Sequence, residues 1–250
     1  MSRLNIIALM GKLQSGKDTA GQMLIDLGGG VRVAFADKLK AICGEMYGLT
    51  HEQMNTEEGK AEKTTLTCLR CPLCSGIACQ EVKLDREWKA ECLNPSCKAV
   101  GEIKSFRDFW TPRMILQHVG TEGMRRVDPN VWVRYALDHA KTILTEGVEV
   151  TVATPGHRRK VGDRFTPNFV VLTDCRFRSE MAGVVAAGGE VWRIKRPNND
   201  ASSTGIANHA SEMEMDSIPD GEFNRVINND GTLGDLKARV SAALTQFMDR

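Results

Sequence analysis

Two glycines and a lysine, Gly11, Gly16 and Lys17, have the spacing Gly-x4-Gly-Lys. Glycines in such a turn let backbone N–H groups point at a chain of phosphates, and a helix beginning near Gly16 adds the positive end of its dipole. The lysine would neutralise a transferring phosphoryl group. The pattern therefore predicts a phosphate-binding loop, or P-loop. The residues expected to contact nucleotide phosphates are Gly11, Gln14, Ser15, Gly16, Lys17, Asp18 and Thr19.

The position after Lys17 departs from the usual P-loop pattern. Asp18 stands where a serine or threonine hydroxyl normally contacts Mg²⁺, and Thr19 follows it. Either Asp18 holds the metal through water or Thr19 contacts it directly, and both alternatives stay open. A glycine-rich turn without a nucleotide is disfavoured, because the preceding strand, the spacing and the lysine occur together.

Two pairs of cysteines predict a second kind of site. Their spacings are Cys-x2-Cys and Cys-x4-Cys, and seventeen residues separate the pairs, which is typical of four-cysteine zinc sites. The expected ligands of a structural Zn²⁺ are Cys71, Cys74, Cys92 and Cys97. Cys68 could replace a member of the first pair, whereas Cys79 is interpreted as a spare hairpin residue. Free buried thiols are the alternative. So small a segment, however, has too little hydrophobic core to fold without a cross-link such as a bound metal.

Further polar side chains follow predicted strands or share a helix face. Asp174 ends a β-branched run and Arg176 comes two residues later. The carboxyl ends of parallel strands form the edge where such sheets bind phosphates, so both side chains are candidates for that edge. Asp37 also follows a strand, although it could simply cap a helix. Arg113 and Gln117 are four residues apart and could face one ligand.

Composition limits the classes of protein to consider. The 250 residues are 42% apolar and 26% charged, as in a folded protein with one large core, either alone or with a small attached module. Lys plus Arg number 33 against 32 Asp plus Glu, so the broad basic surface of a nucleic-acid-binding protein is not expected. The sequence predicts no membrane association and a cytoplasmic location, where clustered cysteines favour metal over disulfides.

Apolar periodicity predicts alternating strands and helices, and hence an α/β fold with a parallel sheet flanked by helices. Residues 50–65 are polar and predict a linker or mobile arm, and residues 81–89 predict a hairpin turning near Asp85-Arg86. The predicted strands are 6–10, 31–36, 169–174, 191–194 and 225–228. The predicted helices run from near Gly16 through Leu27, over 37–47, from Pro112 to Gly120, over 132–144, from about Glu180 to Gly188, and over 233–247.

Taken together, these residues resemble the phage deoxynucleoside monophosphate kinase family, which has the P-loop kinase fold. The similarity covers most of the chain outside residues 50–108, and the order and spacing of the stretches make it specific. The matching stretches are 11–19 with its Gly-Lys-Asp-Thr ending, 35–40, 112–122, 130–132, 174–180, 188–197, 209–212 and 227–231.

The resemblance implies phosphoryl transfer from ATP, with Mg²⁺, to a deoxynucleoside 5′-monophosphate. Its partners would be small nucleotides, and a homodimer is left open. The implied catalytic residues are Lys17, Arg113, Asp174 and Arg176, with Asp174 as a metal or water ligand. The implied acceptor-binding residues are Asp37, Lys38, Arg113, Gln117, Thr121, Arg126, Trp132, Arg176 and Glu180. Arg125 could take the place of Arg126.

The cysteine-rich segment departs from this family. It occupies the place of the acceptor-binding arm, so the identity of the acceptor stays open. The predicted organisation is a kinase core, 1–66 and 101–250, with an inserted zinc-ribbon-like module, 67–100. The alternative function is a P-loop kinase that phosphorylates hydroxymethylated bases within DNA.

Overall fold

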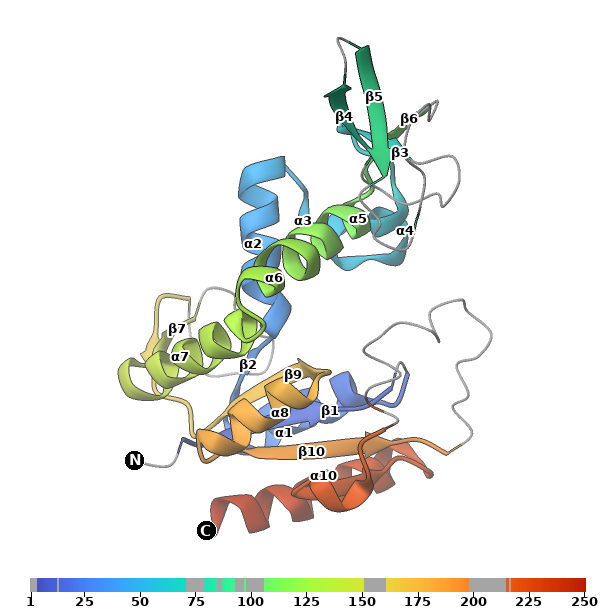
Figure 1. The fold of residues 1–250 in the computed structure, drawn as a ribbon. Coiled ribbons are helices and arrows are strands. Elements are labelled where there is room, and N and C mark those ends of the chain that lie inside the picture. The colour runs from blue at the N-terminus through green and yellow to red at the C-terminus, as the bar shows by residue number, and fades with distance from the viewer. Residues whose placement is uncertain are drawn as a thin grey trace. The chain divides into compact units, whose positions relative to one another are not determined.

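The computed structural model describes residues 4–12, 14–70, 79–84, 87–92, 97, 106–150, 161–197, 215 and 217–250. The chain forms two compact units (Figure 1). The first unit comprises Met1–Lys38 with Val127–Arg250, and the second comprises Leu39–Arg126. The predicted boundaries at 67 and 100 stay a prediction, because much of that segment lies outside the described residues.

The first unit contains a five-stranded sheet in the order β11-β10-β1-β9-β2, and every neighbouring pair is parallel. The central strand β1 consists of five apolar residues in a row, all buried. Such a run suits a strand covered on both faces. The predicted α/β fold with a parallel sheet is confirmed. The strands are β1 (Ile6–Met10), β2 (Val31–Val33), β9 (Val170–Cys175), β10 (Glu190–Lys195) and β11 (Arg225–Asn228).

Helices cover both faces of this sheet (Figure 1). On one face, α1 (Lys17–Gly28) and α10 (Leu233–Met248) pack against each other and share a core with the strands. On the other face lie α7 (Val131–Glu146) and α8 (Arg178–Ala186). The unit also contains a short antiparallel pair, β7 (Val148–Glu149) with β8 (Arg164–Phe165), and the single turn η2 (Asp220–Glu222). The sheet and its covering helices thereby place the loop after β1 at the carboxyl edge.

The second strand and the following helix differ from the predicted bounds. Strand β2 stops at Val33 and α2 (Phe35–Tyr47) begins two residues earlier than expected, so Asp37 lies in the first turn and is not the N-cap. The reason is a tertiary contact, because Asp174 of β9 accepts the backbone N–H groups of Phe35 and Ala36. These bonds satisfy donors that a helix start leaves unpaired.

The second unit contains two short helices within residues 50–65, so the prediction of a linker there is wrong, whereas the mobile arm stays a prediction. They are α3 (His51–Asn55) and α4 (Glu57–Ala61). Thr50 and Gln53 form a reciprocal capping box on α3, and Thr56 accepts a backbone N–H at the start of α4. Such caps let short polar segments form helical turns. Buried Met54 joins the small core of this unit.

The helix predicted from Pro112 begins there, with Thr111 as its N-cap and Pro112 in the first turn. The predicted helix end at Gly120 is wrong. Instead α5 (Pro112–Gln117) continues as the π-helical η1 (His118–Met124) and then as α6 (Arg125–Val127). A continuous helical path therefore carries side chains that the sequence placed beyond a helix end.

The cysteine-rich segment is described in part, by its strands. β3 (Thr67–Arg70) pairs antiparallel with β6 (Phe106–Phe109), and β4 (Cys79–Leu84) pairs antiparallel with β5 (Glu87–Cys92). The predicted hairpin over 81–89 is confirmed as the antiparallel pair β4–β5, in which Leu84 pairs with Glu87, and the predicted turn at Asp85-Arg86 lies outside the described residues. None of the helices in the described part of the chain combines the length and apolar character that a membrane crossing requires.

Candidate functional site

The loop between β1 and α1 has the backbone geometry of an anion-binding turn. Gln14 has a φ of 61°, and Gly16 has a φ of 94° as the N-cap of α1. A positive φ is uncommon for a residue other than glycine and marks a turn that its surroundings hold in place. Among the described residues no side chain caps α1, so the N–H groups of its first turn are available to an anion.

Glycine is required at two positions of this loop. A Cβ on Gly11 would lie 2.5 Å from Ser15 Oγ and 2.6 Å from the carbonyl oxygen of Ile194. A Cβ on Gly16 would collide with Asn229 Nδ2. The loop is therefore packed against the ends of β10 and β11 without space for larger residues.

Asn229 supports the loop and was missed as a site residue, although it belongs to the stretch 227–231 that resembles the kinase family. Its Nδ2 donates a hydrogen bond of 2.9 Å to the carbonyl oxygen of Ser15. Its backbone N–H donates to the carbonyl oxygen of Lys195 at 2.7 Å. An asparagine directly after β11, at the same edge as the loop, was the signal that could have identified it.

Ser15 and Lys17 bring a hydroxyl and an ammonium group to this loop. Ser15 is 2% exposed, and its Oγ has no hydrogen-bond partner among the described residues. A buried hydroxyl normally has a partner, so its state here fits a loop that is completed by a ligand. The Lys17 side chain is 12% exposed, and its Nζ lies 4.0 Å from the carboxylate of Asp18. The loop can therefore surround phosphate oxygens with N–H, hydroxyl and ammonium donors.

Two exposed residues at the start of α1 are the candidates for Mg²⁺. The side chain of Asp18 is 83% exposed, and Thr19 is also exposed. Oxygen ligands of this kind suit Mg²⁺, which retains several waters and binds through substrate phosphates as well. Both alternatives from the sequence therefore remain.

Asp174 lies at the carboxyl end of β9, beside the loop's own strand β1. Its Oδ1 accepts the N–H of Phe35 at 2.7 Å, and its Oδ2 accepts the N–H of Ala36 at 3.1 Å. Burial raises the pKa of Asp174, while these two hydrogen bonds and the charge of Arg176 oppose the rise. The structure thus adds an anchoring role for α2 to the metal or water contact predicted for this carboxylate.

Glu180 has a comparable role at the start of α8. It is buried, and its Oε2 accepts the backbone N–H groups of Arg176 at 2.8 Å and Phe177 at 3.2 Å. These bonds hold the backbone from which the exposed Arg176 side chain projects. The contact predicted between Glu180 and an acceptor stays a prediction, and the structure adds this support of Arg176.

The other predicted acceptor residues of the first unit lie on α2 and α7. Asp37 accepts the N–H of Ala34 at 2.8 Å. Lys38 Nζ lies 5.8 Å from the ring centroid of Tyr135. Trp132 is only 4% exposed, so it belongs to the packed interior of this unit. Asp37 and Lys38 are therefore the exposed side chains of this set, whereas Trp132 is buried.

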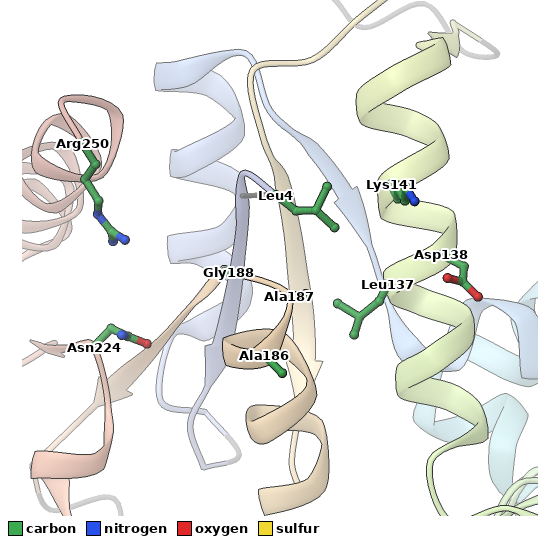
Figure 2. A pocket seen from close by; sticks show the side chains of 10 residues that line it. Leu4, Leu137, Asp138, Lys141, Ala186, Ala187, Gly188, Asn224 and Arg250 are labelled. Atoms are coloured by element: carbon green, nitrogen blue, oxygen red, sulfur yellow. The ribbon is translucent and has the colours of Figure 1, made fainter. Parts of the chain in front are cut away.

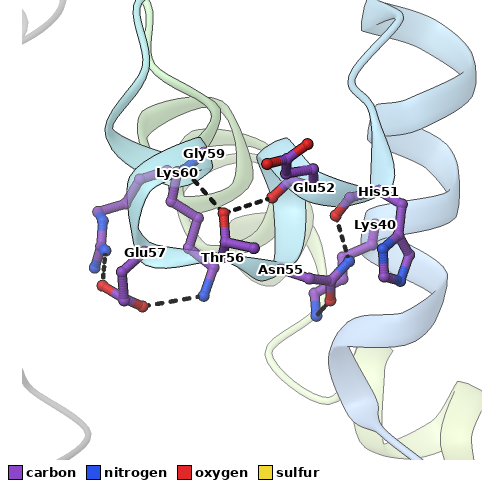
Figure 3. A network of polar contacts seen from close by, with 9 residues as sticks. Lys40, His51, Glu52, Asn55, Thr56, Glu57, Gly59 and Lys60 are labelled. Carbon is purple, nitrogen blue, oxygen red and sulfur yellow. Dashed lines mark hydrogen bonds and ion pairs between the residues drawn. The ribbon is translucent and has the colours of Figure 1, made fainter.

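In the second unit, Arg113 pairs with a carboxylate. Its Nη2 lies 2.5 Å from Glu57 Oε2, and the other oxygen of Glu57 lies 3.3 Å from Lys60 Nζ (Figure 3). Arg113, and to a lesser extent Lys60, lower the pKa of Glu57. Two cations thus share one exposed carboxylate, and an incoming phosphate would compete with it for Arg113.

The remaining predicted residues of this unit follow along the same helical path. Gln117 and Thr121 are exposed on α5 and η1. Arg125 is half-buried and Arg126 is exposed on α6, and which of the two belongs to the site stays open.

The predicted zinc ligands are described only in part. Cys71 and Cys74 lie outside the described residues, so the zinc site stays a prediction. Within the described part of the chain, no group of three or more His, Cys, Asp or Glu side chains is placed to hold a metal. In the register of β4 and β5, Cys79 lies directly opposite Cys92. Cys79 therefore stays open as a further candidate ligand.

A cavity of about 740 Å³ in the first unit lies at the other edge of the sheet (Figure 2). It is lined by residues that precede strands, among them Leu4, Gly189 and Asn224, and by Lys141 of α7. Open α/β sheets bind ligands at the carboxyl ends of their strands. This cavity is therefore not the candidate nucleotide site.

A viral protein and a solved kinase structure are similar to this chain. No family model matches the chain. A protein of Acanthamoeba polyphaga mimivirus, named "Putative deoxynucleotide monophosphate kinase", is 28% identical over 239 residues, which cover 94% of this chain and 93% of the viral protein. The solved structure of dephospho-CoA kinase from Campylobacter jejuni matches with a TM-score of 0.44 and 11% identity, over 98% of each chain.

Proposed function

We propose that this protein transfers the γ-phosphate of ATP to deoxynucleoside 5′-monophosphates and forms the diphosphates. The observation that carries the proposal is the loop after β1, in which Ser15 Oγ is buried without a described partner and Lys17 begins α1. The viral relative, similar over 94% of this chain, supports a nucleotide as the substrate. A viral setting would make DNA precursor supply the purpose of the reaction.

The donor side follows from the loop. Its backbone N–H groups, Ser15 Oγ and Lys17 Nζ would bind the β- and γ-phosphates and hold the chain extended for transfer. Asp18 or Thr19 would hold Mg²⁺, which supplies positive charge to the transferring group when bound. Asn229 would keep the carbonyl of Ser15 turned away from the phosphates.

On the acceptor side the reaction requires positively charged side chains, and it does not require a general base. The attacking atom is an oxygen of the acceptor's phosphate, which is already anionic, so no side chain has to remove a proton. Arg176, supported by Glu180, would stabilise charge in the transition state. Arg113 would bind the acceptor phosphate after exchanging its contact with Glu57.

A structural Zn²⁺ bound by Cys71, Cys74, Cys92 and Cys97 is part of the proposal. Four thiolates leave no open position for water, so the ion would shape the acceptor side and take no part in the chemistry. The register of β4 and β5 brings the backbones of Cys79 and Cys92 together, and Cys79 is an alternative ligand.

A coupled assay over all common and modified deoxynucleoside monophosphates tests the proposal. We expect ATP-dependent turnover of at least one free monophosphate. Phosphorylation of polymeric DNA alone, with every monophosphate inert, would refute it in favour of a kinase acting on bases within DNA.

A further inference from the structure

The second unit contains a cavity of about 450 Å³ that the proposed reaction does not use. Three ring side chains, three aliphatic side chains and two threonines line it. They are Tyr47, Trp110, His118, Leu66, Ile115, Val119, Thr65 and Thr67. Its volume lies within the range of roughly 300–1,000 Å³ that is usual for small-molecule sites. It is therefore large enough for a ring system of the size of a nucleobase.

The cavity lies on a different face of the α5–η1 path from the predicted acceptor residues. Ile115, His118 and Val119 line it. Arg113 and Gln117 are spaced four apart on the opposite side of the helical turn, and Arg113 contacts Glu57. The cavity is thus separate from the side chains proposed to bind the acceptor phosphate.

The aromatic wall of the cavity is held in place by backbone hydrogen bonds. The N–H of Trp110 donates to the carbonyl of Leu66 at 2.8 Å, and the N–H of Thr64 donates to the carbonyl of Trp110 at 2.9 Å. The rings of Trp110 and His118 have centroids 5.4 Å apart and planes inclined by 57°. A planar ligand can therefore stack on a preformed aromatic surface, at low cost in side-chain ordering.

The polar groups of the cavity suit an uncharged ligand. His118 Nδ1 lies 2.5 Å from Glu122 Oε2, and a carboxylate there favours the N–H on Nδ1. In the neutral ring this leaves Nε2 as an acceptor, and the hydroxyls of Thr65 and Thr67 add donors and acceptors. The described residues that line the cavity include no Lys, Arg, Asp or Glu, so they offer no charged side chain of these types to a phosphate.

We propose that this cavity, named here the Trp110 pocket, binds the base of a nucleoside, with sugar and phosphate outside. The choice of a nucleobase over another uncharged ring rests on the proposed function. The base could belong to a free nucleotide or to single-stranded DNA, because both present the same ring to an aromatic wall.

Titration of the full chain with the four deoxynucleosides tests the proposal, with the Trp110 indole N–H and the His118 ring followed by NMR. We expect saturable shifts at both residues. The His118→Ala variant should bind about 3- to 10-fold more weakly, as for the loss of one neutral hydrogen bond. The Thr65→Val variant gives a second, less disruptive change. The matched control is His139→Ala, which removes an exposed histidine of α7 and should leave binding unchanged.

Two further ligands identify the source of the base. A deoxynucleoside monophosphate should bind this pocket with the same affinity as the corresponding nucleoside, because the phosphate makes no contact there. A short oligothymidylate could instead bind more than about 10-fold more tightly than thymidine, with an affinity that falls as salt is added. That result would assign the base to single-stranded DNA.

The proposal is overturned if no deoxynucleoside shifts Trp110 and His118, if indole competes equally well, or if His139→Ala weakens binding as much as His118→Ala. The Lys17→Ala variant keeps this test separate from the kinase assignment. It should retain the shifts at Trp110, so loss of turnover with binding intact bears on the reaction alone.

Discussion

Replacement of Asp174 by alanine should release the start of α2 from the sheet. The carboxylate accepts two backbone N–H groups, from Phe35 and Ala36, and Asp174 is half-buried beside them. Its removal leaves two backbone N–H groups at the start of α2 without an acceptor, at a cost of about 1–3 kcal/mol each, or about 2–6 kcal/mol for the pair. The alanine variant no longer buries a carboxyl group, whose burial raises the pKa of Asp174, so we expect a loss in the lower part of this range, about 2–4 kcal/mol in the free energy of unfolding.

Urea unfolding of two matched variants measures this loss. Asp174→Asn keeps one acceptor oxygen and places an amide donor against the second N–H, so it should lose about 1–3 kcal/mol. Asp37→Asn alters a half-exposed carboxylate with one backbone bond, to Ala34, and should lose less than about 1 kcal/mol. An unchanged midpoint and slope for Asp174→Ala would refute the anchoring role, and so would equal losses for both asparagine variants.

The same carboxylate predicts a pH dependence. Its pKa is raised in the folded protein above the ordinary value of 3.8, so the folded state binds this proton more tightly than the unfolded state does. Its contribution to stability is therefore fully present below pH 3.8 and is lost as the pH rises through the folded pKa. The stability difference between wild type and Asp174→Asn should shrink over that interval. A difference that grows with pH would show that the hydrogen bonds to Phe35 and Ala36 outweigh burial.

Four further perturbations test the proposed site. Lys17→Ala should lower turnover in the coupled assay about 10²- to 10⁴-fold with the fold intact by circular dichroism, and a wild-type rate would exclude the P-loop assignment. Asn229→Ala removes the bond to Ser15 and should raise the KM for ATP about 3- to 10-fold, with the KM for the acceptor unchanged. Glu57→Gln frees Arg113 and should lower the KM for the acceptor about 2- to 5-fold. The control Glu58→Gln makes the same charge change at the next residue and should leave this KM unchanged. A higher KM in Glu57→Gln would mean that Glu57 positions Arg113. Metal analysis should find one zinc per chain, and its removal should raise the acceptor KM while ATP binding persists; equal loss of both would make the metal a general stabiliser.

The local sequence pattern was enough to predict those elements whose conformation depends on their own residues. The uninterrupted apolar run of β1 predicts a strand buried on both faces, and the glycines after it predict the loop. Gly29 ends α1 in the left-handed conformation, as the run of glycines indicates. Alternation of such strands with helices was sufficient for a parallel sheet, and the loop residues followed from spacing alone.

Element ends and support residues depended on partners far away in the chain. The start of α2 is set by Asp174, which lies 139 residues from Phe35, and the loop is supported by Asn229, 214 residues from Ser15. Glu180, predicted for an acceptor, is occupied with the backbone that carries Arg176. A helix begins where its unpaired N–H groups find acceptors, and a strained loop persists where its neighbours hold it. Because those acceptors and neighbours come from other strands, only the tertiary structure could decide them.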